Sequence, residues 1–399
     1  MEPVKLGFIG CGGIAGAHVN GLKALWEHQV RPFEVVAACD VVEANARQLA
    51  EKVAEFQGRP PKVYTDLEQM LTGSEGLEAV DICTLHSEHH TVAVPSLEAG
   101  KHVLIEKPLG ITMRAGRLIL EAAVQARRHL AVAENYRRSP QERARHWAIR
   151  QGRIGAPRTF YWQDVGEGMG KWGWRNFRMD AGAGWVLDGG VHFADLFRYQ
   201  LGTQAQQVYA VTRQYEPYRY DKPKERQGAW PVDVEDLALA LITFDDEVVV
   251  QWSWQGSAPG QRFSKRVLYG SEGCLDWETG WWSRDERHQD NDQLVAEFTA
   301  ALSAEERERL FPGGITDAIA VELKDFADAV RLGTVPEVDG LEGYKAEAIC
   351  LALFESAWHG RPVTLAEIER CETEGYQADI NEALGLTGGG GCGCQGGCR

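Results

Sequence analysis

The chain has 399 residues, of which 44% are hydrophobic and 25% are charged, so its apolar side chains suffice for more than one globular core. The formal net charge of −16 argues against nucleic acid or an anionic membrane as a partner, because both require a basic surface. No apolar run approaches the roughly 20 residues of a membrane-spanning helix, and the first residues show no signal-peptide pattern. We therefore expect a cytoplasmic protein.

Strand and helix signals alternate through residues 1–136, which is typical of a parallel sheet with helices on both faces. The expected strands are residues 4–9, 33–39, 63–64, 79–84, 102–105 and 130–134. The expected helices are residues 14–26, 41–56, 67–71, 91–99 and 115–127. This order predicts an α/β domain of Rossmann type.

Residues 137–399 show long strand patterns with few helices between them, which predicts an α+β domain with a mostly antiparallel, open-faced sheet. The expected strands are residues 158–165, 207–214, 237–244, 248–254 and 266–270, and the expected helices are residues 317–332 and 341–359. Residues 215–235 and 277–315 are charged and are expected to be irregular. The strands from 237 to 254 are apolar on both sides, which predicts a homodimer or homotetramer formed through the open face.

Nine cysteines are present, and all except Cys371 fall into two informative contexts. Five lie in apolar runs and are expected to be small buried side chains: Cys11, Cys39, Cys83, Cys274 and Cys350. Three lie in the Gly-rich tail of residues 387–399: Cys392, Cys394 and Cys398. Three thiolates are one ligand short of a closed zinc site, and the glycines impose no geometry. We favour a disordered or loosely packed tail over a metal site or disulfide chemistry.

A glycine-rich turn joins the first expected strand to the first expected helix, and its candidate cofactor-binding residues are Gly10, Gly12, Gly13 and Ile14. Glycines at this place allow a tight turn and a close approach of backbone N–H groups to a pyrophosphate at the helix N-terminus. The order of strand, turn and helix at the start of the chain favours a dinucleotide site over an ordinary tight turn.

Asp40 follows the second expected strand, where a carboxylate reaches the adenosine ribose of a bound dinucleotide. The carboxylate would bind both ribose hydroxyls and repel a 2′-phosphate, and the next residues, Val41 and Val42, supply no cation. NAD is therefore favoured over NADP as the cofactor. The alternative is that Asp40 caps the following helix.

The sequence Glu-Lys-Pro at residues 106–108 and the sequence Asp-Gly-Gly-Val-His at residues 188–192 are highly specific at this separation. Together with the stretches GFIGCGGIAGAH, AACD, NYRRSP, KWGWR and YGSEGCL, they resemble the Gfo/Idh/MocA family of oxidoreductases. The resemblance covers most of the chain and implies a Rossmann domain followed by an open-faced sheet domain, with nicotinamide and substrate meeting between them. In place of the Pro-Asn of many members, Leu85-His86 follows Thr84, which changes the loop on the nicotinamide side.

The resemblance also implies roles for individual residues. The catalytic positions fall on Lys107, Asp188 and His192. The cofactor positions fall on Gly10, Gly12, Asp40, Thr84, His89 and Glu106, and we add His86 and Lys107 as their neighbours.

The residue types themselves suit oxidation of a secondary alcohol, which requires a base beside the hydroxyl group. His192 has the intrinsic proton affinity of a general base in oxidation and a general acid in reduction. The Lys107 ammonium could stabilise a developing alkoxide. Asp188 and His192 are four residues apart, so a continuous helix would place both on one face, with Asp188 orienting the array. The alternatives are a buried helix histidine and a surface lysine.

Candidate substrate contacts lie near these residues and near the domain boundary. They are Tyr136, Arg137, Trp174, Arg175, Asp188 and His192, with Trp162 and Trp172 as further aromatic candidates. Aromatic faces stack on sugar C–H faces and Arg donates to hydroxyls, although each Trp could equally pack on a sheet. We expect no metal site, because His86, His89 and His90 lack a nearby cluster of carboxylate or cysteine partners.

Three classes of function fit these features. We favour an NAD-dependent oxidoreductase that transfers a hydride between nicotinamide and a ring hydroxyl or ketone of a small polyol or carbohydrate. The second is a redox-neutral glycosidase or lyase that oxidises a ring carbon transiently and returns the hydride. The third, a non-catalytic NAD sensor, is disfavoured by the joint presence of Lys107, Asp188 and His192.

Overall fold

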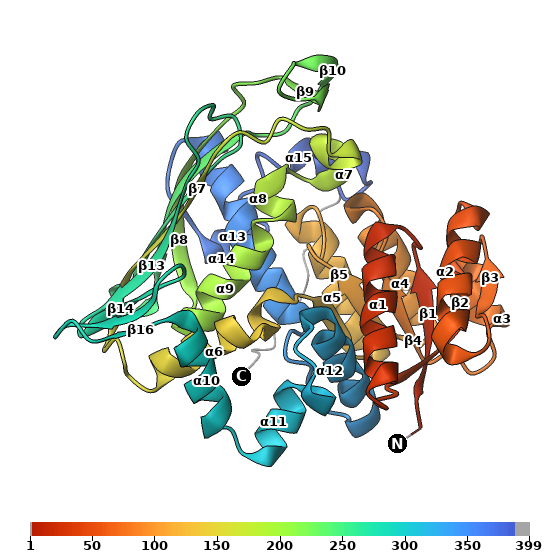
Figure 1. Ribbon diagram of the computed structural model, residues 1–399. Helices are drawn as coiled ribbons and strands as arrows, with labels where there is room; N and C mark the ends of the chain where they lie inside the picture. The colour runs from red at the N-terminus through yellow and green to blue at the C-terminus, as the bar shows by residue number, and fades with distance from the viewer. Residues whose placement is uncertain (1, 388–399) are drawn as a thin grey trace.

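The computed structural model describes residues 2–387, so the predictions for Cys392, Cys394 and Cys398 lie outside the described residues. The two larger sheets lie on opposite sides of the molecule, with helices packed between them (Figure 1). Within the described residues, no helix is both long and apolar enough to cross a membrane.

The N-terminal sheet has six parallel strands in the order β3-β2-β1-β4-β5-β6, as expected for a Rossmann domain. Their bounds are β1 Val4–Ile9, β2 Phe33–Cys39, β3 Lys62–Tyr64, β4 Ala79–Ile82, β5 His102–Glu106 and β6 Leu130–Ala133. The strands are apolar along both faces because helices cover both. These helices are α1 Gly13–Glu27, α2 Glu43–Gln57, α3 Leu67–Gly73, α4 His89–Glu98 and α5 Met113–Ala126.

The second sheet has nine strands in the order β16-β15-β14-β13-β7-β12-β11-β8-β17. The pair β7–β12 is parallel and the other pairs are antiparallel, which confirms the predicted α+β domain. The bounds are β7 Pro157–Val165, β8 Ala205–Arg213, β11 Leu237–Phe244, β12 Val249–Gln255, β13 Phe263–Gly270, β14 Gly273–Asp276, β15 Gly280–Ser283, β16 His288–Gln289 and β17 Val363–Thr364.

Helices cover the face of this sheet that looks toward the Rossmann domain (Figure 1). They include α8 Trp185–Asp188, α9 Val191–Leu201, α13 Gly340–His359 and α14 Leu365–Glu369. The opposite face carries exposed apolar side chains, among them Leu239 and Leu241 of β11. The smaller helices α7 Arg178–Ala181 and α15 Ala378–Ala383 lie at one end of the molecule.

One helix near the C-terminal end of the chain packs on the Rossmann domain and not on the second sheet. Helix α12, Ala318–Leu332, packs against α1 of the Rossmann domain. The segment that follows it also reaches the Rossmann sheet, because the N–H of Val132 in β6 donates to the carbonyl of Val338 at 3.0 Å. The second part of the chain therefore completes the outer layer of the first.

Two segments expected to be irregular contain regular structure, and several helices outside them were not expected, of which α6 is the longest. The hairpin of β9, Tyr218–Lys222, and β10, Gln227–Pro231, lies within 215–235. The stretch 277–315 contains β15 and β16 together with α10, Asn291–Ala301, and α11, Ala304–Leu310. The unexpected helices outside these two segments are α6, Pro140–Arg150, and the short helices α7, α14 and α15. Capping boxes at Asp290 and Ser303 begin α10 and α11, so their start signals are present in the sequence although their charge hides the apolar periodicity.

Candidate active site

The glycine-rich turn after β1 forms one wall of a cavity that also reaches residues of the second domain. Gly10 has a φ of +81°, and a Cβ there would come within 2.7 Å of the Cys83 backbone, so only glycine fits. Cβ atoms built at Gly12 and Gly13 meet nothing within 4 Å, so the backbone at the start of α1 is open to a ligand. A cavity of about 810 Å³ lies over this turn. This open helix N-terminus suits the pyrophosphate of a dinucleotide.

Asp40 lies at the rim of the same cavity, directly after β2. One of its carboxylate oxygens accepts from the Cys11 N–H at 2.8 Å, and the other accepts from the Val42 N–H at 2.8 Å. The N-cap of α2 is Val42, so Asp40 is not the capping residue itself. Among residues 2–387, the single Lys or Arg side chain that lines this cavity is Arg175, which comes from the other domain. The adenosine end therefore suits free ribose hydroxyls.

Lys107 and Asp188 meet across the two domains. The Lys107 ammonium donates to the Asp188 carbonyl at 2.6 Å and lies 3.5 Å from the carboxylate oxygen Oδ1. The same Oδ1 accepts from Arg175 Nε at 3.1 Å and lies 3.2 Å from His86 Nε2. Burial raises the pKa of Asp188, but the hydrogen bond from His86 and the charges of Lys107 and Arg175 outweigh it and hold this pKa well below its usual range. Asp188 is therefore a permanent anion that positions Lys107, and it is not a base.

His192 is held by a residue that the sequence analysis missed. Its Nδ1 lies 2.8 and 2.7 Å from the two carboxylate oxygens of Glu134, the residue directly after β6. Both side chains are buried, with 8% and 3% of their surface exposed. Burial raises the pKa of Glu134, but the charge and hydrogen bond of His192 outweigh it and lower this pKa. Because Nδ1 is bound to a carboxylate, Nε2 is the ring nitrogen left for a substrate proton.

The expectation that Asp188 and His192 share one helix face is wrong. Helix α8 ends at Asp188 and α9 begins at Val191, with Gly189 and Gly190 between them. A Cβ at Gly190 would come within 2.3 Å of the Val186 carbonyl and 2.7 Å of the Trp252 ring, so the chain packs tightly at this break. The two side chains therefore have separate partners, and Glu134 orients the histidine.

Tyr136 links the two halves of the site. Its ring stacks on His192 with the ring centroids 3.9 Å apart and the planes parallel. Burial and the charges of Glu134 and Asp188 raise its pKa. The side chain is 44% exposed, so it remains available to a substrate.

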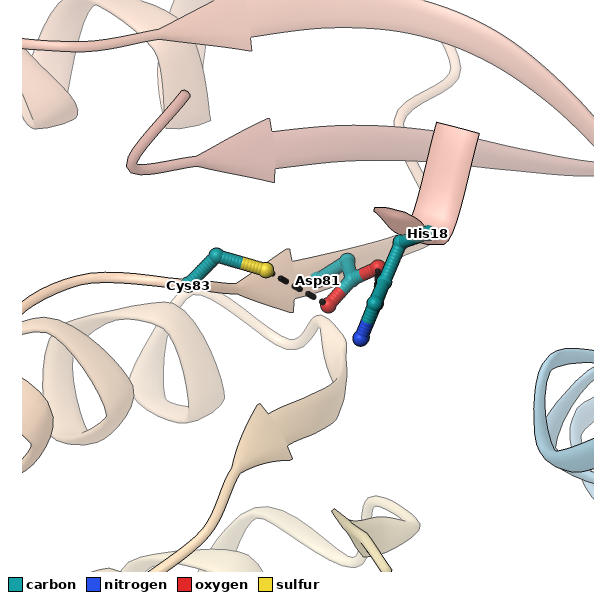
Figure 2. Close-up of side chains that lie close together, drawn as sticks. All are labelled: His18, Asp81 and Cys83. Carbon is teal, nitrogen blue, oxygen red and sulfur yellow. Dashed lines mark hydrogen bonds and ion pairs between the residues drawn. The ribbon is translucent and has the colours of Figure 1, made fainter. Parts of the chain in front are cut away.

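His18, Asp81 and Cys83 form a buried cluster (Figure 2), and Glu106 contacts it through His18. His18 of α1 binds Asp81 of β4 through Nδ1 at 2.7 Å and Glu106 through Nε2 at 3.1 Å. Burial lowers the pKa of His18, but the charges and hydrogen bonds of Asp81 and Glu106 raise it well above the ordinary value, so the ring is an imidazolium. It fixes the Glu106 carboxylate, whose other oxygen accepts from the Lys107 N–H at 3.1 Å.

The donor atoms of this cluster are bonded to one another rather than arranged around an empty centre. The Cys83 thiol donates to Asp81 at 3.5 Å, and burial together with the Asp81 charge raises its pKa well above the ordinary value. The hydrogen bonds of His18 and Cys83 thus go to protein carboxylates. The cluster is a support for the site, and His18 was missed although it lies within the quoted GFIGCGGIAGAH stretch.

The remaining predicted contacts divide between the cavity and the interior. Thr84, Trp172, Trp174 and Arg175 line the cavity together with Asp188. His89 is fully buried, its Nδ1 lies 2.8 Å from the Pro108 carbonyl, and burial lowers its pKa to about 3. It supports the loop after Lys107 instead of lining the cavity.

Two predicted substrate contacts are occupied elsewhere. Arg137 is buried and its guanidinium binds the Asp195 carboxylate, with Nε donating at 2.8 Å. Trp162 is 1% exposed and packs against Phe193 with ring centroids 4.7 Å apart. Arg137 is thus held by an ion pair and Trp162 by ring packing. This corrects the expectation that the two side chains contact the substrate.

Two family models match most of the chain. The model described as oxidoreductase family, NAD-binding Rossmann fold, matches residues 4–134. The model described as oxidoreductase family, C-terminal alpha/beta domain, matches residues 147–365. Both come from the set named Gfo/Idh/MocA, and the N-terminal domain is thus an NAD-binding domain.

Curated relatives and solved structures agree with these models. The chain is 26% identical to levoglucosan dehydrogenase of Pseudarthrobacter phenanthrenivorans, over 90% of this chain and 97% of the relative. It is 25% identical to myo-inositol 2-dehydrogenase of Thermotoga maritima, over 92% of this chain and 99% of the relative. An oxidoreductase domain protein from Kribbella flavida has the same fold, with a TM-score of 0.73, 23% identity, and coverage of 92% of this chain and all of that one.

Proposed function

The chain belongs to the Gfo/Idh/MocA family of oxidoreductases, and from that premise we propose that it transfers a hydride between NAD and a ring hydroxyl or ketone of a sugar, cyclitol or glycoside. The observation that carries the proposal is the pairing of His192 with Glu134 in the same site as the Lys107–Asp188 pair, since burial raises the pKa of Glu106 while the charges of Lys107 and His192 both act to lower it. The named substrates of the relatives, levoglucosan and inositols, support a carbohydrate or polyol.

Alcohol oxidation needs one residue that accepts the hydroxyl proton and another that stabilises the developing oxyanion. When bound, NAD supplies the acceptor for the hydride from the carbinol carbon. His192 takes the hydroxyl proton at Nε2, while Glu134 holds Nδ1–H and stabilises the imidazolium that forms. Lys107 has three N–H donors, two of which point to Asp188, so one remains for the substrate oxygen. In the reverse direction His192 returns the proton to the alkoxide.

Replacing His192 with Ala tests this assignment. We expect single-turnover NADH formation with inositols and sugars to slow by about 10²–10⁴-fold, because the proton acceptor is lost. The control is His146→Ala, since His146 also stacks on a tyrosine, Tyr199, with centroids 4.2 Å apart, yet lies outside the site. NAD binding should survive both changes.

The outcome separates the candidate activities. A His192→Ala variant that keeps more than about a tenth of the wild-type rate would remove this histidine from the role of base. Cleavage of a glycosidic bond without net NADH would replace the dehydrogenase proposal with a redox-neutral one.

A further inference from the structure

Two more cavities adjoin the cofactor cavity on the side of the second domain. The smaller, of about 240 Å³, shares Trp172 and Arg175 with the cofactor cavity. The larger, of about 500 Å³, shares four lining residues with the smaller one: Gly168, Trp185, Trp254 and Gly256. The three cavities thus follow one another from the dinucleotide site along the inner side of the sheet. This space is additional to the volume available for NAD.

Two tryptophans form the wall common to the outer cavities. Trp185 of α8 and Trp254 of β12 are stacked with centroids 4.9 Å apart and an interplanar angle of 8°. Both are only half-buried although they are large apolar side chains. Stacked indoles at a cavity wall suit the flat apolar face of a sugar or an aromatic ring.

The larger cavity also carries polar groups. Arg266 donates to both carboxylate oxygens of Asp164 at 2.9 Å, and Ser264 donates to the same carboxylate at 2.7 Å. Arg266 Nε is buried and has no hydrogen-bond partner in the structure. The guanidinium lies over the rings of Trp162 and Phe193, 4.6 and 5.0 Å from their centroids, so packing as well as the ion pair with Asp164 fixes its position. An apolar wall beside the polar lining residues Asp164, Ser264 and Arg266 is the composition of a carbohydrate subsite.

Two lining residues connect the outer cavities to the catalytic residues. Arg175 lines the smaller cavity and binds Asp188. Trp185 packs on Phe193, the neighbour of His192, with ring centroids 5.4 Å apart. A ring that is oxidised beside Lys107 and His192 would therefore project its substituent toward the tryptophan pair.

We propose that the outer cavities form a second substrate subsite, so that the enzyme acts on a glycoside whose second ring stacks at Trp185 and Trp254. The proposal rests on the proposed dehydrogenase function and specifies its substrate class. The shared chemistry of the second ring is a flat apolar face, which a second sugar and an aromatic aglycone both present. Single-ring sugars and cyclitols would leave the subsite empty and bind more weakly.

Gly168 offers a way to block the subsite without disturbing the fold. It lines both outer cavities, and a Cβ built there meets nothing within 4 Å. Its N–H donates to the Gly256 carbonyl at 2.8 Å, a backbone contact that any residue preserves. Gly168→Leu should therefore fill cavity space, and Gly168→Ala is the matched control because its single carbon does not reach across.

The experiment measures both binding and turnover. Cellobiose and phenyl β-glucoside are the two-ring ligands, and methyl β-glucoside is the single-ring ligand, each followed by tryptophan fluorescence and by NADH formation. We expect wild-type affinity to be at least about 10-fold higher for a two-ring ligand, and Gly168→Leu to remove this advantage while Gly168→Ala keeps it. Whichever of cellobiose and phenyl β-glucoside binds more tightly identifies the second ring.

The readouts separate the two proposals. Equal affinity for single-ring and two-ring ligands in the wild type, or an equal loss of both in Gly168→Leu, would overturn the subsite even if NADH forms. Tight two-ring binding that depends on Gly168 would support the subsite, and failure to form NADH in that case would count against the dehydrogenase function alone.

Discussion

Replacing Glu134 with Gln removes the negative charge behind His192 and keeps the size of the side chain. In the wild type both Glu134 oxygens lie within 2.8 Å of Nδ1, and Oε1 also accepts from the Tyr136 N–H at 3.0 Å. An amide has one acceptor oxygen, so the variant can still orient the ring. It can no longer neutralise the imidazolium that forms as the hydroxyl proton arrives.

The magnitude follows from the burial of the pair. Little solvent reaches either group, since 3% of Glu134 and 8% of His192 is exposed, so water screens their interaction weakly. A hydrogen bond to a charged group contributes about 1.5–3 kcal/mol. Each 1.4 kcal/mol or so of barrier changes a rate tenfold. We therefore expect Glu134→Gln to slow hydride transfer by about 10- to 150-fold.

Single-turnover NADH formation measures this effect, with NAD titration as the check on cofactor binding. The control is Glu142→Gln, because Glu142 is also buried and binds Arg145 at 2.6 Å and Gln200 at 2.8 Å, but not His192. Glu142→Gln should lower the melting temperature and leave the chemical step within about two-fold. A Glu134→Gln rate within two-fold of wild type, or an equal loss in the control, would refute a catalytic role for the pairing.

Further predictions concern the cofactor, the lysine, the buried cluster and assembly. Asp40→Ser should narrow a preference for NAD over NADP in fluorescence titrations, and a wild-type preference for NADP would contradict the role of Asp40. Lys107→Met should slow hydride transfer by about 10²–10³-fold with NAD affinity retained, as judged by single-turnover rates. Because the folded pKa of His18 lies well above its usual value, its stabilisation is complete below about pH 6.5 and is lost as the pH rises through that folded value. In urea unfolding, the free energy of unfolding of His18→Gln should therefore fall less at alkaline pH than that of the wild type. If the two proteins show parallel dependences of this free energy on pH, His18 is not an imidazolium. We also propose a homodimer or homotetramer through the exposed face of the second sheet, where Leu241 is 50% exposed, so Leu241→Asp should lower the mass by light scattering. A wild-type mass near 44.3 kDa would refute assembly.

Much of the Rossmann domain follows from local sequence. Its strands are short apolar runs bounded by glycine or polar residues, and each helix begins where its periodicity begins, so strand order and connection follow from known rules of parallel sheets. Gly10 and Asp40 also follow from local sequence, because a turn after β1 and the end of β2 are fixed places relative to the strands. Lys107 and His192 were found through sequence motifs rather than periodicity.

The partners of the catalytic residues were decided by the tertiary structure alone. Glu134 meets His192 across 58 residues, and Arg137 meets Asp195 across the same separation, so no periodic pattern marks either pair. The sequence shows Asp188 and His192 four residues apart, but it does not show that the tightly packed Gly189–Gly190 break gives them different partners. The sequence specifies the charge and size of each side chain. Its partner, however, depends on which strands and helices the folded chain brings together.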